Sequence, residues 1–163
     1  MSDTPRLSRI EAGVIAVWVF HQIEDLTTHG SVVGSLRRQE ETVGDIDILV
    51  EVAPPFFENA AKIKSRILTK AKWHRGGDRM MVFRDVLGVD VHLDLFLCYP
   101  PRCYYSLLAL RTGPKEDTQA LVAGLEKNGY PRPHAEIPVR GEKELYELAG
   151  VEYVNPKERR RDV

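Results

Sequence analysis

The spacing of apolar residues changes between a helical and a strand period along the chain. Ile10, Val14, Val17 and Phe20 recur at intervals of three or four and predict a helix over residues 5–25. Similar patterns predict helices over residues 57–73, 104–110, 117–127 and 142–149. Runs rich in Val, Ile, Leu, Met or Phe predict strands over residues 31–33, 44–52, 80–84 and 89–97. Thr112-Gly113-Pro114 interrupts these patterns, so we expect a boundary between residues 1–112 and 113–163.

The length of 163 residues indicates one compact unit, or a small domain with an appendage. Hydrophobic residues make up 43% of the chain, and the net charge of -1 shows no overall basicity that would indicate a polyanionic partner. Cys98 and Cys103 are too few for a disulfide scaffold. No apolar run approaches the ~20 residues of a membrane span, and the N-terminus lacks the pattern of a signal peptide. We therefore expect an intracellular, soluble monomer that does not bind membranes.

Two carboxylates interrupt the apolar strand predicted over residues 44–52. In a strand, Asp45 and Asp47 share one face while Ile46 and Ile48 point to the other. Adjacent carboxylates repel each other unless a cation lies between them, and hard divalent cations prefer such oxygen ligands. Asp94, in the strand predicted over residues 89–97, would complete a cluster of three if the two strands were neighbours.

Such a cluster suits two Mg²⁺ ions, with Mn²⁺ as a substitute, and in-line phosphoryl transfer. One ion would lower the pKa of the attacking hydroxyl, and the other would hold a triphosphate. An acidic pair in a strand is weak evidence alone, because edge strands often expose acids to solvent. The turn at Gly34-Ser35, nine residues before Gly44, makes the pattern more specific. Its backbone N–H groups, the Ser35 hydroxyl and the Arg38 guanidinium are groups that bind phosphate oxygens.

The motif G-S-x-R-R-x5-G-D-x-D, followed by a later strand with an aspartate, resembles the nucleotidyltransferase superfamily and, in its spacing, DNA polymerase family X. Tyr104-Tyr105 with Thr112-Gly113, the segment IPVRGEKELYELAGVEYVNPKERR and the segment TPRLSRIEA extend the resemblance over nearly the whole chain. The resemblance implies an α+β fold. Residues 1–112 would form a palm with a mixed sheet and flanking helices, and residues 113–163 a small α/β nucleotide-binding subdomain.

The resemblance also implies roles for individual residues. Asp45 and Asp47 would bind both metal ions, and Asp94 would bind the catalytic ion and help to deprotonate the primer 3′-hydroxyl. The triphosphate would be bound by Arg6, Gly34, Ser35, Arg38 and Gly44. The sugar and base of the nucleotide would lie near Leu110, Arg111, Gly113 and Thr118. The primer terminus would lie near His92.

Basic residues are concentrated in residues 62–79, which hold seven lysines and arginines and one acid. Lys62, Arg66 and Lys70 recur every four residues and would form a stripe on the helix predicted over residues 57–73. The stripe is a candidate for binding the DNA phosphate backbone, and a solvated helix face is the alternative. A second candidate is the tail with Lys157, Arg159, Arg160 and Arg161.

The activity implied is that of a DNA-directed DNA polymerase that adds deoxynucleotides to a primer 3′-hydroxyl in short gaps. Leu110, Thr118 and Val122 stand where the family has residues that check the sugar, the base and the template, so we expect low fidelity. The palm would begin near residue 5, so we expect no lyase activity. One alternative is a template-independent or RNA- or protein-directed nucleotidyltransferase. Another is a catalytically inactive binding module, which the intact aspartates and Ser35 speak against.

Overall fold

The computed structural model describes residues 6–159, and a mixed five-stranded sheet forms its centre. In spatial order the strands are β2 (Thr27–Val33), β4 (Asp45–Val52), β7 (Val89–Cys98), β6 (Met80–Val86) and β5 (Lys72–Gly76). β4 and β7 are parallel, and the other neighbours are antiparallel. Two short strands, β1 (Leu7–Ser8) and β3 (Thr42–Val43), pair beside the sheet. The chain is therefore α+β with a mixed sheet, as expected.

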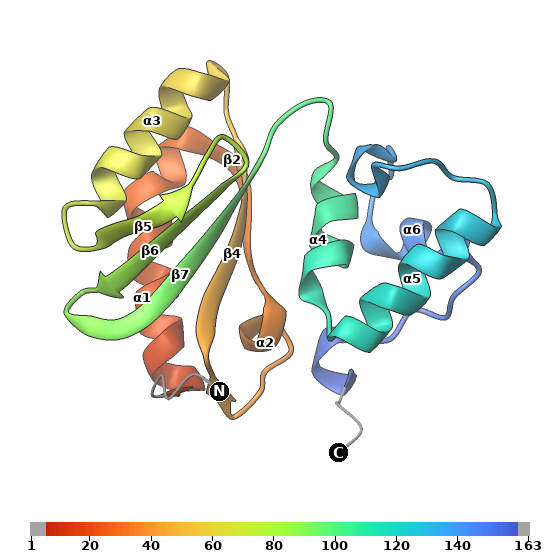
Figure 1. The fold of residues 1–163 in the computed structure, drawn as a ribbon, viewed down its shortest axis with the longest axis horizontal. Helices are drawn as coiled ribbons and strands as arrows, with labels where there is room; N and C mark the ends of the chain where they lie inside the picture. Colours follow the sequence, from red (N-terminus) through yellow and green to blue (C-terminus); the bar gives the residue numbers. More distant parts are fainter. Residues whose placement is uncertain (1–5, 160–163) are drawn as a thin grey trace.

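The helices form two groups (Figure 1). They are α1 (Arg9–Ile23), α2 (Gly34–Arg37), α3 (Phe56–Ile67), α4 (Tyr104–Thr112), α5 (Lys115–Lys127) and α6 (Glu142–Ala149), with 3-10 turns at Glu24–Leu26, His134–Glu136 and Pro156–Glu158. α1 and α3 cover one face of the sheet, whereas α4, α5 and α6 lie together beside the β2–β4 side. Within residues 6–159 no helix is long and apolar enough to cross a membrane.

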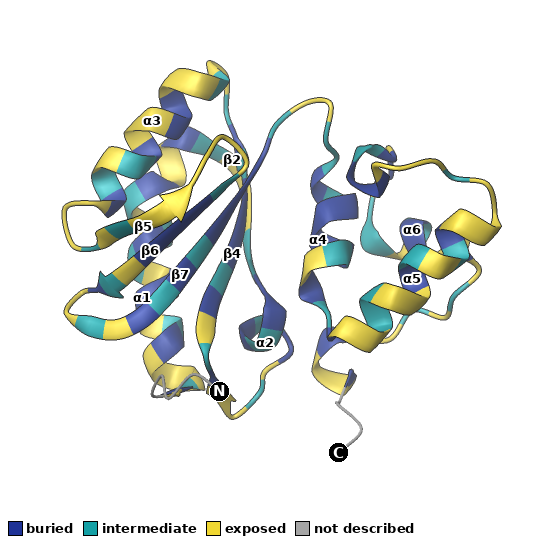
Figure 2. Ribbon diagram, viewed as in Figure 1, coloured by how far each residue is buried: buried dark blue, intermediate teal, exposed yellow. Residues whose placement is uncertain are grey.

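The two faces of the sheet differ in chemistry because side chains alternate along each strand. One face, with Ile48 and Leu95 at its centre, packs against α1 and α3 in the largest apolar cluster. On the other face, Leu49 and Phe96 pack against Leu107 of α4. Buried residues therefore run through the central strands, and the edge strand β5 is largely exposed (Figure 2). The part of this second face that α4 leaves open carries the aspartates.

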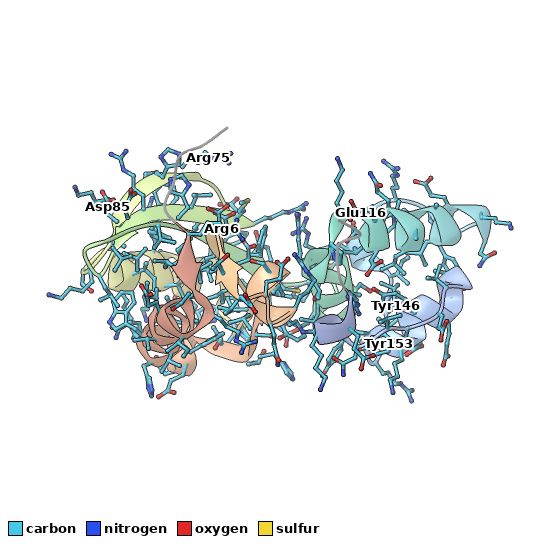
Figure 3. The ribbon with its side chains drawn as sticks, turned by 90° about the horizontal axis from the view of Figure 1, so that it is seen from below. Arg6, Arg75, Asp85, Glu116, Tyr146 and Tyr153 are labelled. Atoms are coloured by element: carbon cyan, nitrogen blue, oxygen red, sulfur yellow. The ribbon has the colours of Figure 1, made fainter. Side chains whose placement is uncertain are left out.

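α4 joins the sheet to the other helices. It contributes to the apolar cluster on the sheet and to a separate cluster with Leu121, Leu125 and Leu145 of α5 and α6. In that group Tyr146 and Tyr153 meet edge to face, with ring centroids 5.3 Å apart (Figure 3). Polar bonds add to the packing, since Arg37 Nη1 donates to Thr112 Oγ1 at 2.6 Å and also pairs with Glu142. Residues on both sides of position 112 thus hold α2 against α4 and α6.

Several boundaries differ from those predicted. The helix predicted over residues 57–73 ends at Ile67, and residues Lys72–Gly76 form the strand β5. Trp73 packs edge to face on Phe83 of β6, with ring centroids 5.6 Å apart, so strand pairing and burial override local helical propensity. The predicted basic stripe is therefore interrupted, because α3 ends at Ile67 and Lys70 lies beyond it.

Two other boundaries move for local reasons. The first helix begins at Arg9, because Leu7–Ser8 pairs with β3 and the Ser8 side chain accepts from the Glu11 N–H as an N-cap. β2 begins at Thr27, earlier than the strand predicted over residues 31–33, since it pairs with β4 along its length. Pro5, Arg160 and Arg161 lie outside the described residues.

Candidate functional site

Two aspartates meet across the parallel pair β4 and β7. Asp47 lies opposite Asp94 in the register, and Asp45 lies opposite His92, which confirms that the two strands are neighbours. Burial together with the charge of the neighbouring Asp94 raises the pKa of Asp47 to about 7. Burial and the charge of Asp45 also raise the pKa of Asp94. This pair is favourable only when a proton or a cation offsets its negative charge.

The donor set at this point fits a hard divalent cation, because its ligands are carboxylate oxygens. Asp47 and Asp94 are half-buried and lie opposite each other in the register, whereas Asp45 is exposed at the start of β4. Among residues 6–159, no three or more His, Cys, Asp or Glu side chains are gathered into a group that could hold a metal ion. The three aspartates therefore share one face of the sheet without forming a closed ligand cage in the described part of the chain.

A cavity of 340 Å³ opens beside Asp45 and Asp47. Its wall combines α2, the start of β4 and the turn between α4 and α5. The lining residues are Arg6, Gly34, Ser35, Arg38, Glu40, Gly44, Asp45, Asp47, Arg111, Gly113, Pro114 and Lys115. All five residues predicted to bind a triphosphate are among them. Four arginines and lysines therefore lie around a space that is also lined by the three carboxylates of Glu40, Asp45 and Asp47.

Arg38 is held firmly in this wall. Its side chain is buried, and its Nη1 donates to the Thr112 carbonyl at 2.6 Å while Nη2 donates to Glu40 Oε2 at 2.9 Å. The Nε atom is buried without a hydrogen-bond partner among the described residues. Arg6 is held differently, because it is exposed and its Nε donates to Thr42 Oγ1 at 2.9 Å. Of these two guanidinium groups, that of Arg38 is buried and fixed by hydrogen bonds, whereas that of Arg6 is exposed.

Gly34 brings the backbone of α2 against the carboxylate pair. Its φ is +60°, and a Cβ atom at this position would lie 2.3 Å from Asp47 Oδ2. A contact that short is far inside van der Waals distance, and the left-handed backbone is itself unfavourable for residues with a Cβ. Glycine is therefore required here for two separate reasons, conformation and close approach.

Replacing Gly34 with alanine is expected to lower the free energy of unfolding by about 2–4 kcal/mol, since it adds both backbone strain and a collision with Asp47. Gly88→Ala is the matched control, because Gly88 has a φ of +76° but no atom within 4 Å of the position its Cβ would take. That control should cost only about 1 kcal/mol. Urea unfolding of the two variants measures the difference, and equal losses would show that the contact with Asp47 does not matter.

A second cavity of 510 Å³ adjoins the first. Its lining residues are Asp47, Met80, Asp94, Phe96, Leu110, Arg111, Gly113, Lys115, Thr118 and Gln119. All four residues predicted near the sugar and base are among them, and Asp47, Arg111, Gly113 and Lys115 line both cavities. The Arg111 guanidinium lies 4.5 Å from the centre of the Phe96 ring. Desolvation and Arg102 lower the pKa of Arg111, and the charges of Asp47 and Asp94 act in the opposite direction.

The residues predicted to bind DNA are divided between the two sides of the sheet. His92 lies on the acidic face, opposite Asp45. Lys62 and Arg66 belong to α3, which packs on the other face, and Lys70 follows that helix. Arg66 also donates to Asp25 Oδ2 at 3.1 Å and to the Gln22 carbonyl at 2.9 Å. The structure therefore does not bring these three residues together with the carboxylates.

Lys115 is a site residue that was not predicted from the sequence. It is the first residue of α5, and it lines both cavities. The available signal was its position directly after Thr112-Gly113-Pro114, the segment already predicted to lie beside the nucleotide. Glu40 was missed as well, and its role is to hold Arg38.

The site therefore combines aspartates of the central sheet with arginine and lysine side chains. The aspartates are Asp45, Asp47 and Asp94, and the cations are Arg6, Arg38, Arg111 and Lys115. Neither models of known protein families nor curated proteins match the chain.

Proposed function

We propose that this chain is a nucleotidyltransferase of the DNA polymerase family X type, which adds deoxynucleotides to a primer 3′-hydroxyl in short gaps. The observation that carries the proposal is the Asp47–Asp94 pair at the junction of the two cavities. The α+β architecture with a mixed sheet is compatible with a nucleotidyltransferase palm. Transfer of a nucleotide needs a place for a triphosphate, a place for an attacking hydroxyl and negative groups between them. This surface offers those three features side by side.

Asp45, Asp47 and Asp94 would hold Mg²⁺, or Mn²⁺ in its place. When bound, such ions neutralise charge on the reacting phosphate and lower the pKa of an attacking hydroxyl. The aspartates themselves orient the reaction, because Asp45 and Asp47 line the first cavity whereas Asp94 lines only the second. Asp94 also borders β6, on the side away from the first cavity, and there it would face the acceptor hydroxyl beyond the sugar of the nucleotide.

The first cavity suits the triphosphate. The Ser35 hydroxyl and the guanidinium groups of Arg6 and Arg38 are donors to phosphate oxygens. The buried Nε of Arg38 supports an anionic ligand, since a buried donor without a partner costs about 1–3 kcal/mol. A phosphate oxygen at the cavity wall would remove part of that cost. Gly34 allows this backbone to lie directly against Asp47.

The second cavity suits the sugar and base. Met80, Phe96 and Leu110 provide apolar surface, and Thr118 and Gln119 provide polar groups. Arg111 and Lys115 lie at the shared wall, where the phosphates and the sugar of one nucleotide would join. The wall contributed by Leu110 is aliphatic, which supports weak discrimination between deoxynucleotides and ribonucleotides.

The test is primer extension on a duplex with a one-nucleotide gap, with Mg²⁺, each deoxynucleotide and ribonucleotide, and each template base. We expect template-directed addition that is lost with EDTA. Addition that ignores the template would favour the alternative of a template-independent transferase. No addition, and no stabilisation by any triphosphate with Mg²⁺ or Mn²⁺, would contradict the proposal. A triphosphate at 100 times its Kd should stabilise the fold by about 2.7 kcal/mol.

A further inference from the structure

The acidic face of the sheet continues beyond Asp94 over β6 and β5. Val82 of β6 lies opposite Asp94 on one side and opposite Arg75 of β5 on the other. Arg84 of β6 lies opposite His92. Because residues directly opposite in an antiparallel ladder share a face, Arg75 and Arg84 point to the same side as Asp94. Figure 3 shows Arg75 on the side of the sheet away from α1.

The cations on this face are available to a ligand. Arg75 and Arg84 are exposed, and among residues 6–159 no ion pair joins either of them to a carboxylate. The nearby acid Asp85 is paired with Lys72 at 3.4 Å. Asp90, at the exposed start of β7, is a further acid on the same face as Asp94. The His74 and His92 rings lie 5.0 Å apart.

Two basic residues of α3, unlike Arg75 and Arg84, already have partners within the protein. Arg66 is bonded to Asp25 and to the Gln22 carbonyl. The Lys64 ammonium lies 3.8 Å from the centre of the Trp73 ring. These cations are already partnered, and the sheet separates them from Asp94. Arg75 and Arg84 are therefore cations on the same face of the sheet as Asp94, whereas those of α3 are on the other face.

We propose that the open face of β7, β6 and β5, with Arg75 and Arg84 as its principal contacts, binds the phosphate backbone of the acceptor nucleic acid. The placement of the acceptor 3′ end at Asp94 rests on the proposed function. Two strand spacings of about 4.8 Å separate β7 from β5, so the face spans roughly three nucleotides at ~3.4 Å each. Positive side chains at that scale match a polyanion with regularly spaced charges. α4, which covers the other end of this face, confines the backbone to the open strands.

The test measures binding of a fluorescent gapped duplex as a function of salt, without metal ions or triphosphate. Arg75→Gln/Arg84→Gln should reduce the slope of log K against log salt by about 2, because each phosphate contact contributes about 0.9. Affinity at ~0.1 M salt should fall roughly 10- to 100-fold by the same relation. Lys62→Gln/Lys64→Gln, which removes the same charge from α3, should change both quantities little.

Three outcomes would overturn the proposal. They are an unchanged slope in the arginine variant, an equal decrease in both variants, and no duplex binding by the unmodified protein, which would favour an acidic protein partner. Thermal unfolding of both variants shows whether they are folded, and protection of Arg75 and Arg84 from phenylglyoxal by the duplex gives a second measurement on the unmodified chain. A smaller slope without any nucleotide transfer would support this face and contradict the proposed function. Nucleotide transfer by the protein together with an unchanged salt slope in the arginine variant would support the proposed function and contradict binding at this face.

Discussion

Asp94→Ala is expected to abolish nucleotide transfer and to leave most of the triphosphate binding intact. The reason is that Asp94 lines the second cavity only, whereas Asp45, Asp47 and the residues proposed to bind the triphosphate line the first. Removing a carboxylate that acts on the attacking hydroxyl should slow the reaction about 10³-fold or more, which corresponds to ~4 kcal/mol of transition-state stabilisation. Single-turnover extension of a gapped duplex measures the rate, and thermal stabilisation by a deoxynucleoside triphosphate with Mg²⁺ measures binding.

Asp90→Ala is the matched control, since Asp90 is exposed on the same strand and the same face. It should transfer nucleotides at nearly the rate of the unmodified protein. Retained turnover in Asp94→Ala would show that the assigned role is wrong. Loss of triphosphate binding together with turnover would show that Asp94 serves the first cavity as well.

The raised pKa of Asp47 should make the stability of the fold depend on pH. Without divalent ions, we expect the free energy of unfolding to fall as pH rises from about 4 to about 7. Burial and the Asp94 charge raise the pKa of Asp47 to about 7 in the folded chain. Between the ordinary value of about 4 and this value, the native state therefore binds more protons than the unfolded state, and stability must decrease with pH. The loss should be on the order of 2–4 kcal/mol, because one pKa unit corresponds to ~1.4 kcal/mol.

Urea unfolding at a series of pH values, with EDTA present, measures this dependence. Asp47→Asn should flatten the curve because it removes the titrating group, whereas Asp90→Asn should leave the slope in place. Addition of Mg²⁺ at pH 8 should restore stability to the unmodified protein, since a cation replaces the missing proton. A curve that rises between pH 4 and pH 7 would contradict the burial of Asp47 beside Asp94.

The arginine pair in the motif illustrates how local pattern and tertiary role diverge. The sequence predicted a phosphate contact for Arg38, and the structure places Arg38 in the wall of the first cavity. Arg37 instead pairs with Glu142 and donates to Thr112, more than seventy residues away along the chain. Nothing in the local spacing distinguishes these two roles, because they depend on which element packs against each side of α2.

Properties that depend on near neighbours along the chain could be predicted from the amino-acid order alone. Asp45 and Asp47 had to share a face because strand side chains alternate with a period of two. A tight turn was likewise predicted at Gly34, because glycine has no Cβ and adopts backbone conformations that are unfavourable for other residues. The mixed α+β character followed from apolar spacing and from the resemblance, and the strands around Asp47 and Asp94 were recognised within a few residues of their observed ends.

Which elements are neighbours is settled only by the tertiary fold. It placed Asp94 opposite Asp47, turned residues 72–76 from a helix end into the edge strand β5, and put Lys62 and Arg66 on the layer away from the carboxylates. It also brought Lys115 and Arg111 to the wall shared by the two cavities. Strand order and helix placement depend on the burial of apolar surface between segments that are distant in the chain. They therefore cannot be predicted from the local spacing of residues.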